Sequence, residues 1–416
     1  MNQPHFAKTI RFLFLSVLVA VGVSACDFEV TNPGPTQDVR LDDQGAHISV
    51  VNGARLLTAR ALGDLAYIGS EPARELTTAG RVFPVKLPSQ SGVLQDNAHN
   101  RQWNLAHQAR FMAEDAVRRF EDTVDDPDGY ELTAQALKLA GFTNRLLGEN
   151  KCEAVIASSA AQPHTVHLER AEGHFTRAME SASRTGQSDV AMASQAGRAQ
   201  VRLLLGDFQG AASDAQQVPT GFVHQARYSD ENQDQRNILY WTNDNVPYRA
   251  HSAWNTFYED YYEETGDPRV RWGFDPNNPV GEFSGVPWFF QLKYDNYEAP
   301  IALATGREMR LIEAEAALSQ QDWQGAMEIL NQVRTSVVSD HDGAALEALE
   351  ASNAEEAWTH MKRERGIETW LEARRLGDLR RWLDAGTPGE QENMEGRDIC
   401  FPISETERQT NPNIPL

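Results

Sequence analysis

Residues 207–218 read DFQGAASDAQQV, and residues 322–333 read DWQGAMEILNQV. Each copy follows a stretch rich in Ala and Leu, AQVRLLLG before the first and AEAALSQQ before the second. In both copies the aspartate can cap a new helix, the aromatic residue can fill the space between helices, and the small residues permit close packing. The repeat predicts pairs of packed helices; the alternative is chance similarity between two amphipathic helices.

The rest of the chain beyond residue 45 also has mainly helical periodicity, so we expect a mainly α fold. The repeated segment resembles the second helix of a tetratricopeptide repeat, which implies helical pairs of that type. Amphipathic stretches lie at 47–66, 101–121, 131–149, 165–183, 189–205, 207–217, 304–319, 322–336 and 355–384. We predict a single domain over 46–416, with a helical scaffold at about 46–220 and 301–396 and an extended C-terminal segment at 397–416.

Residues 221–300 differ from the scaffold, because Pro and Gly are frequent there and the helical period fades. Residues 240–297 contain four of the nine tryptophans and seven of the ten tyrosines. We expect an inserted, loop-rich and aromatic-rich lobe whose rings stack on sugar faces or, alternatively, form the core of the lobe. The candidate ligand contacts are Trp254, Tyr258, Trp272, Trp288 and Tyr294.

The composition excludes several classes of function. The net charge is -22, with 38 Lys+Arg against 60 Asp+Glu, which disfavours nucleic acid and strongly anionic ligands. Three cysteines without a CxxC motif argue against a structural metal, and His164 with His167 lacks a third ligand in zinc-protease order. No motif for a nucleotide or another cofactor occurs, and no catalytic residue stands out; an acidic pair such as Glu263-Glu264 leaves a glycoside hydrolase as the weaker alternative.

The first 25 residues have the pattern of a signal peptide. Lys8 and Arg11 precede an uncharged apolar run at 12–23, which is too short to span a bilayer as a helix. The sequence VSAC at 23–26 resembles the lipobox of bacterial lipoproteins, so we expect Cys26 to become the acylated N-terminus. Residues 26–45 then form a polar tether, and two or more acyl chains anchor the protein stably to a membrane.

Three C-terminal segments carry a more specific resemblance. Residues 307–316 read REMRLIEAEA, residues 364–382 read ERGIETWLEARRLGDLRRW, and residues 401–414 read FPISETERQTNPNI. In this order, and together with the lipobox, they resemble the SusD/RagB family of outer-membrane nutrient-binding lipoproteins. Ala373 stands where that family usually has glycine, and Ser404 replaces its second proline.

The resemblance implies a SusD-like fold and a non-enzymatic protein that faces the cell exterior from the outer membrane. Its expected partners are a glycan or another oligomeric nutrient and a SusC-like TonB-dependent transporter, to which the nutrient is delivered. The alternative is a non-catalytic interaction platform that uses the helical repeats. The charged 364–382 segment needs no catalytic role, because packed or solvated ion pairs explain it.

Cys152 and Cys400 are the thiols that remain once Cys26 is acylated. An exported protein is in a compartment that permits disulfides, so these two either bond or stay as separate buried thiols.

Overall fold

The computed structural model describes residues 38–80, 87–243, 246, 248–282 and 285–415. Residues Gln44–Leu416 form one compact unit. Met1–Asp43 form another, of which the structure describes the short 3-10 helix η1 (Asp38–Asp42) and Asp43. The signal-peptide segment, Cys26 and most of the tether lie outside the described residues.

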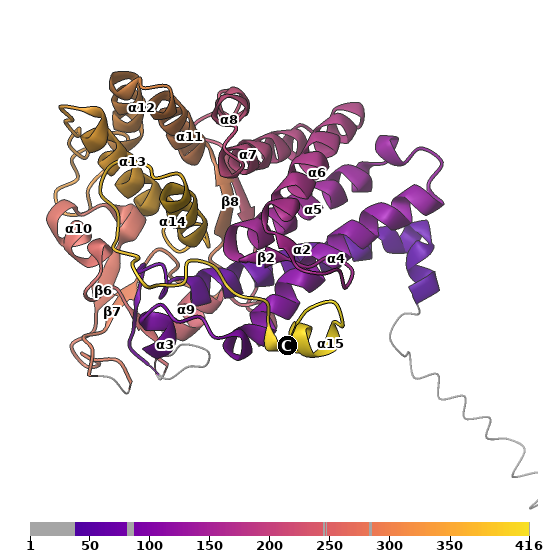
Figure 1. Ribbon diagram of the computed structural model, residues 1–416, viewed down its shortest axis with the longest axis horizontal. Helices are drawn as coiled ribbons and strands as arrows, with labels where there is room; N and C mark the ends of the chain where they lie inside the picture. The colour runs from indigo at the N-terminus through magenta and orange to yellow at the C-terminus, as the bar shows by residue number, and fades with distance from the viewer. Residues whose placement is uncertain (1–37, 81–86, 244–245, 247, 283–284, 416) are drawn as a thin grey trace, which may run out of the picture. The chain divides into compact units, whose positions relative to one another are not determined.

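Helices dominate the unit from Gln44 onward, as predicted (Figure 1). The first group consists of α2 (Gln44–Gly69), α4 (Asn100–Thr123), α5 (Glu131–Asn150), α6 (Thr165–Arg184), α7 (Ser188–Leu204) and α8 (Phe208–Ala215). The second group consists of α11 (Gly306–Ser319), α12 (Trp323–Arg334), α13 (Ala354–Glu368) and α14 (Arg375–Asp384). Consecutive helices pack against each other throughout the first group and from α11 to α13, and α11 packs on α8, which joins the two groups.

Both copies of the sequence repeat form the start of a helix in the structure, as predicted. The side chain of Asp207 accepts a hydrogen bond from the amide of Gly210 (2.9 Å), and Asp322 accepts one from Gly325 (3.0 Å). These bonds satisfy amide groups that have no partner within the helix, so each aspartate starts the second helix of a pair. The pairs are α7 with α8 and α11 with α12.

Close packing in the first group depends on two glycines that face one ring. A Cβ atom built on Gly141 in α5 would lie 2.5 Å from the ring of Phe175 in α6, and one on Gly197 in α7 would lie 2.4 Å from it. Phe175 is fully buried between them. The two glycines therefore allow three helices to meet around one aromatic side chain.

The described strands form four two-stranded antiparallel sheets, and none of them makes a large sheet. They are β1 (Thr77–Thr78) with β5 (His251–Ser252), β2 (Glu153–Ala154) with β3 (Gln162–Pro163), β4 (Val223–Ala226) with β8 (Ile301–Thr305), and β6 (Trp272–Phe274) with β7 (Phe289–Gln291). The shorter helices are α3 (Leu87–Gln90), α9 (Ile238–Asn243), α10 (Phe257–Thr265) and α15 (Glu405–Thr410). The lobe thus combines α9 and α10 with β5, β6, β7 and long loops.

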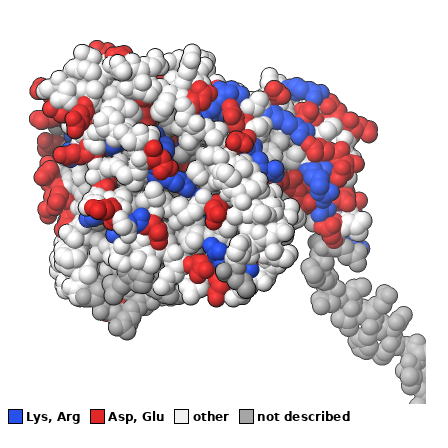
Figure 2. All heavy atoms as spheres, in the orientation of Figure 1, with Lys and Arg blue, Asp and Glu red and all other residues white. Residues whose placement is uncertain are grey.

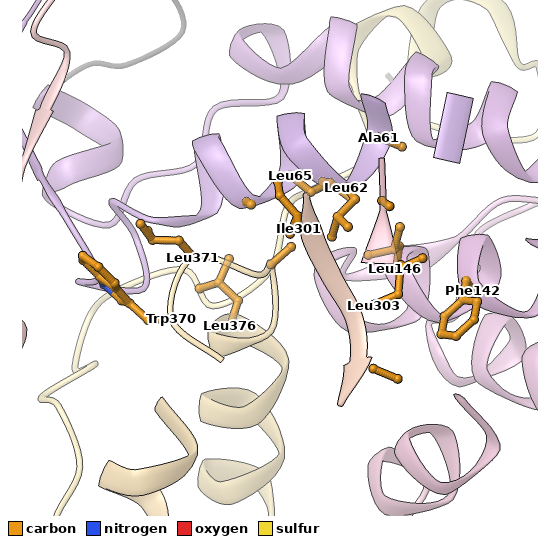
Figure 3. Packing of buried hydrophobic residues seen from close by; sticks show 14 of the residues in the cluster. Ala61, Leu62, Leu65, Phe142, Leu146, Ile301, Leu303, Trp370, Leu371 and Leu376 are labelled. Carbon is orange, nitrogen blue, oxygen red and sulfur yellow. The ribbon is translucent and has the colours of Figure 1, made fainter. Parts of the chain in front are cut away.

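The main core lies where the helices meet the β4–β8 sheet (Figure 3). Leu62 and Leu65 of α2 face Ile301 of β8, while Leu303 of β8 and Leu146 of α5 continue the apolar layer. All five side chains are buried, and each contributes roughly 1.5–3 kcal/mol relative to an exposed position. This core fixes the lobe to the scaffold through β8.

The helix expected at 355–384 is two helices. Residues 369–374 interrupt it, because Leu371 and Ala373 both have a left-handed backbone with φ of 59°. The carboxylate of Glu75 holds this turn, since it accepts the amide hydrogen of Leu371 (2.9 Å). A left-handed residue favours glycine. Leu371 and Ala373 therefore mark the break.

The C-terminal segment, expected to be extended throughout 397–416, contains the short helix α15. The hydroxyl of Ser404 accepts a hydrogen bond from the amide of Glu407 (3.3 Å) and caps this helix. Before it, the amide of Phe401 donates to the carbonyl of Asn150 (2.8 Å), and the amide of Cys152 donates to the carbonyl of Phe401 (3.0 Å). The segment thereby attaches to the chain that follows α5.

Candidate functional site

Three of the five candidate ligand contacts are core residues in the structure. Tyr258 is 1% exposed, Trp288 2% and Tyr294 3%. Tyr258 stacks on Trp370 in the break between α13 and α14, and the indole of Trp288 donates to the carbonyl of Asn243 (3.0 Å). These three rings hold the lobe together and do not reach the surface.

The other two candidates, Trp254 and Trp272, are half-buried. The main chain of Trp254 accepts a hydrogen bond from the hydroxyl of Thr77 (2.7 Å) and so connects β5 with β1. Trp272 begins β6, and its indole donates to the carbonyl of Glu259 in α10 (3.2 Å). This bond fixes the orientation of the Trp272 ring at the edge of the hairpin.

Trp272 belongs to a row of rings on one face of the lobe, which we term the aromatic strip: Tyr262, Trp272, Phe289 and Phe274. The pairing of Phe274 with Phe289 and of Trp272 with Gln291 places these side chains on one face of the β6–β7 hairpin. Trp272 stacks on Phe289 with centroids 4.6 Å apart, and Phe274 meets Phe289 edge-on at 5.9 Å. Tyr262 of α10 extends the row at 5.9 Å from Trp272.

The strip is accessible from solvent. Phe274 is 49% exposed, and Tyr262, Trp272 and Phe289 are half-buried. Four neighbouring rings form a contiguous apolar surface, and such surfaces often mark a site that a partner covers. The strip is therefore the best candidate for ligand contact in the lobe.

Polar groups border the strip at its α10 end. The hydroxyl of Tyr262 donates to Asp340 (3.2 Å), and the exposed Arg271 lies 3.3 Å from the same carboxylate. His341 packs against Tyr262 with centroids 5.6 Å apart. Rings with hydrogen-bonding groups beside them suit a ligand that has both apolar faces and hydroxyl groups.

Loops from distant parts of the chain come together next to the hairpin. The amides of Ala79 and Gly80 both donate to the carbonyl of Ala250 (2.8 and 2.9 Å). Gly281 lies so close to Ala79 that a Cβ there would be 2.1 Å from its carbonyl oxygen. Figure 2 shows few charged side chains on the visible surface over the part of the lobe that contains β6 and β7 in Figure 1.

The charged C-terminal signature is part of the interior. Arg365 and Arg381 both pair with Asp378 (2.7 and 2.9 Å), while Arg374 pairs with Glu149 and Glu308 (2.6 and 2.8 Å). Burial alone would raise the pKa of Asp378, but Arg365, Arg381 and Arg374 together lower it to about 2. Asp378 is thus a buried, ionised anchor between helices. The signature has a structural role here.

Cys152 and Cys400 form a disulfide with Cα atoms 5.0 Å apart. It lies beside the main-chain bonds that attach the C-terminal segment to the end of α5. His167 is buried and contacts the amide oxygen of Asn144 through its Nδ1 (3.0 Å), so this histidine has a partner within the helical packing. Within the described residues no three metal-binding side chains are grouped to hold an ion, and no helix is both long and apolar enough to cross a membrane.

The sequence-based prediction missed Tyr262, Phe274 and Phe289. The alternation Trp272-Gly273-Phe274 was a period-two signal that could have placed Trp272 and Phe274 on the same face of a strand. Nothing in the sequence indicated which residues of the second strand lie opposite them.

Comparison with known proteins agrees with this architecture. Residues 307–414 match the model of the SusD family. A SusD superfamily protein from Bacteroides thetaiotaomicron VPI-5482 superposes with a TM-score of 0.67 and 14% identity, over 89% of this chain and 98% of the other. A SusD superfamily protein from Bacteroides fragilis gives 0.66 and 12%, over 89% and 99%.

A SusD-like carbohydrate-binding protein from Bacteroides vulgatus ATCC 8482 gives a TM-score of 0.62 and 13% identity, over 89% of this chain and 97% of the other. No curated protein matches the chain. The chain thus has a SusD-like fold over most of its length, and the sequence of residues 307–414 matches the SusD family.

Proposed function

We propose that this chain is a surface-anchored lipoprotein that binds oligomeric glycans and delivers them to a SusC-like TonB-dependent transporter of the outer membrane. The observation that carries the proposal is the aromatic strip, a solvent-accessible row of rings on the lobe of a SusD-like fold. The proposed glycan binding also agrees with the description of the B. vulgatus protein as carbohydrate-binding.

The strip supports glycan binding through its chemistry. The C–H faces of pyranose rings are apolar and pack on aromatic rings, whereas their hydroxyl groups need hydrogen-bonding partners. Successive centroids in the strip are 4.6–5.9 Å apart, so several rings are presented to one extended ligand. Because Trp272 is held by its bond to Glu259, little side-chain entropy is lost when a ligand binds.

Calorimetry on the soluble protein from residue 27 onward tests this proposal against a panel of neutral oligosaccharides and peptides. Phe274→Ala removes an exposed ring from the strip, and Phe111→Ala removes a ring that is 61% exposed on α4 outside it. Loss of one stacking contact of about 0.5–1.5 kcal/mol weakens binding roughly twofold to twelvefold. We expect this loss for Phe274→Ala and no change for Phe111→Ala.

Each other outcome argues for a different function. Equal effects of the two substitutions would remove the strip from the binding site. Saturable binding of peptides alone would make peptides the nutrient, and the appearance of cleavage products would make the protein a hydrolase. A protein that binds none of these ligands would fit the interaction platform.

The proposed location has its own test. Metabolic labelling with palmitate is expected to tag the wild-type protein and not Cys26→Ala, which should also leave the membrane fraction. For the transporter, the anchored protein is expected to co-purify from detergent-solubilised outer membranes with a TonB-dependent channel, and an untagged strain serves as the control. Labelling of the Cys26→Ala variant, or the absence of a channel, would contradict the respective part of the proposal.

A further inference from the structure

A cleft beside the β4–β8 sheet is basic, although the chain as a whole is strongly acidic. It consists of two adjoining pockets of about 480 and 260 Å³ that share Arg55 and Arg227. These volumes together fall within the range of about 300–1,000 Å³ that is usual for small-ligand sites. We term it the basic cleft.

Four cationic side chains from separate parts of the sequence line the basic cleft. Arg55 and Arg60 come from α2, Lys138 comes from α5, and Arg227 directly follows β4. None of the described residues that line either pocket is Asp or Glu. The whole chain has 60 acidic and 38 basic residues, so the charge composition of this lining is the opposite of that of the chain.

Within the described residues Arg55 and Arg227 form no ion pair with a carboxylate, whereas Arg60 interacts with Asp64 and Asp234, and Lys138 with Asp189. Arg55 donates to the neutral side chains of Asn52 (2.7 Å) and Gln135 (3.0 Å). Arg60 lies 3.4 Å from Asp234, a carboxylate that is 68% exposed outside the lining. Arg227 is exposed. The guanidinium groups of Arg55 and Arg227 therefore keep donors that an incoming oxyanion can use.

Two neighbouring groups respond to this positive field. Burial, followed by the charge of Arg55, lowers the pKa of Lys138 to about 8, although Asp189 acts in the opposite direction. Burial, followed by the charges of Lys138, Arg145 and Arg55, lowers the pKa of His224 to about 3. Burial is the main cause of both shifts, and the positive charge of the neighbouring cations adds to it.

A second cavity in the same protein shows the contrasting case. Its volume is about 390 Å³, and Arg269, Lys293 and Arg307 line it together with Glu368 and Glu372. There Lys293 pairs with Glu372 (2.8 Å) and Arg307 with Glu368 (2.9 Å). Internal pairs balance the charges of that cavity, whereas the basic cleft has no acidic lining to do so.

The remaining lining of the basic cleft suits a sugar ring. Leu56, Ala59 and the half-buried Tyr228 provide apolar surface, and Asn52, Ser229 and Gln235 provide hydrogen-bonding groups. The hydroxyl of Tyr228 donates to the carbonyl of Ala59 (2.7 Å), which fixes its ring against α2. Arginine is the side chain that best matches the two oxygens of a carboxylate or sulfate.

We propose that the basic cleft binds an anionic sugar unit, the carboxylate of a uronic acid or a sulfate ester, through Arg55 and Arg227, with Lys138 and Arg60 adding charge. This assignment rests on the proposed function and narrows it to glycans that carry acidic units. The cleft shares no residue with the aromatic strip, so the two sites are tested by different substitutions.

Calorimetry with a galacturonate trisaccharide and its methyl-esterified form tests the assignment, because esterification removes the charge and keeps the sugar. A sulfated neutral trisaccharide distinguishes sulfate from carboxylate as the preferred oxyanion. We expect the wild-type protein to bind at least one acidic form about tenfold more tightly than its uncharged counterpart at low salt, and we expect 0.5 M NaCl to remove most of this preference, as salt screening requires.

The variants Arg227→Gln and Arg55→Gln are each expected to lose most of that preference and to bind the uncharged ligand unchanged. Arg184→Gln is the matched control, since it removes the same charge from an exposed site on α6. Equal binding of the acidic and uncharged ligands, or equal effects of Arg227→Gln and Arg184→Gln, would overturn the assignment. If neutral glycans still bind through Phe274 in that case, the proposed function stands; if no glycan binds, both fail.

Discussion

Lys151 is the buried group whose replacement gives the sharpest test of the packing at the C-terminal segment. Its side chain is 0% exposed, and its ammonium nitrogen lies 5.2 Å from the ring centroid of Trp103 and 5.1 Å from that of Phe401. Among the described residues this nitrogen has no hydrogen-bond partner. Burial lowers the pKa of Lys151 from 10.5 to about 7.

The lowered pKa of Lys151 makes the stability of the protein depend on pH in a defined window. Between about pH 7 and 10.5 the unfolded chain holds a proton on Lys151 that the folded protein lacks, so the free energy of unfolding rises with pH. Each pH unit is worth about 1.4 kcal/mol, and the whole window about 5 kcal/mol. This part of the free energy of unfolding is fully present above about pH 10.5 and is lost as the pH falls toward 7.

Lys151→Met removes this dependence and keeps a linear side chain that can contact both rings. At pH 7.5 the variant should be more stable than the wild type by up to about 4 kcal/mol, since the folded protein no longer has to bury an amine. The gain should shrink by about 1.4 kcal/mol for each pH unit up to pH 9.5. Lys138 and Lys362, whose pKa values burial lowers to about 8, are present in both proteins and cancel in the difference.

Urea unfolding, followed by tryptophan fluorescence at pH 7.5, 8.5 and 9.5 with the disulfide intact, measures the difference. Lys151→Arg is the control, because a guanidinium group stays charged and should destabilise the protein at every pH. A Lys151→Met variant that is less stable at pH 7.5, or whose difference from the wild type is constant with pH, would refute the reasoning.

Three further predictions concern the scaffold. In chemical denaturation, Gly197→Ala should lower the free energy of unfolding by about 1–3 kcal/mol, because its Cβ would meet Phe175. Gly173→Ala in α6 has open space around it and should raise the free energy of unfolding by about 0.5–1 kcal/mol. Equal effects of the two substitutions would contradict the packing. Ala373→Gly should leave the free energy of unfolding nearly unchanged, since relief of the left-handed backbone by about 1–2 kcal/mol offsets the lost methyl group. Ala357→Gly in α13 should lower the free energy of unfolding by about 2 kcal/mol. Similar losses for the two variants would argue against the left-handed turn. Non-reducing mass spectrometry of the mature protein should show no free thiol at Cys152 or Cys400, and detection of both thiols would exclude the bond. The double variant Cys152→Ser with Cys400→Ser should lower the free energy of unfolding by about 2–5 kcal/mol.

The helical scaffold was predictable because its signals are local. A capping aspartate and a helical period of apolar residues determine α8 and α12 within about a dozen positions, and both helices begin where the sequence indicates. The break within 355–384 was missed because neither Gly nor Pro marks it. Leu371 and Ala373 adopt the left-handed backbone since Glu75, nearly 300 positions earlier, holds the turn.

The candidate site was only partly predictable, for a related reason. Aromatic composition indicates where rings gather along the sequence, but it does not distinguish a core ring from a surface ring. Trp288 and Phe289 are adjacent, yet the first is buried against Asn243 and the second lies in the strip. Which of them faces outward depends on the register of the β6–β7 hairpin, where a shift of one residue would exchange the two faces.

Net charge is a similarly incomplete guide to the ligands that a single pocket can bind. A charge of -22 describes the field at a distance, whereas a bound group meets only the side chains that line its pocket. Arg55, Lys138 and Arg227 are separated by more than 80 positions from one to the next, so no window of sequence reveals their grouping. The β4–β8 sheet brings them together between α2 and α5, and a ligand that is excluded by the average composition can therefore be favoured by the local one.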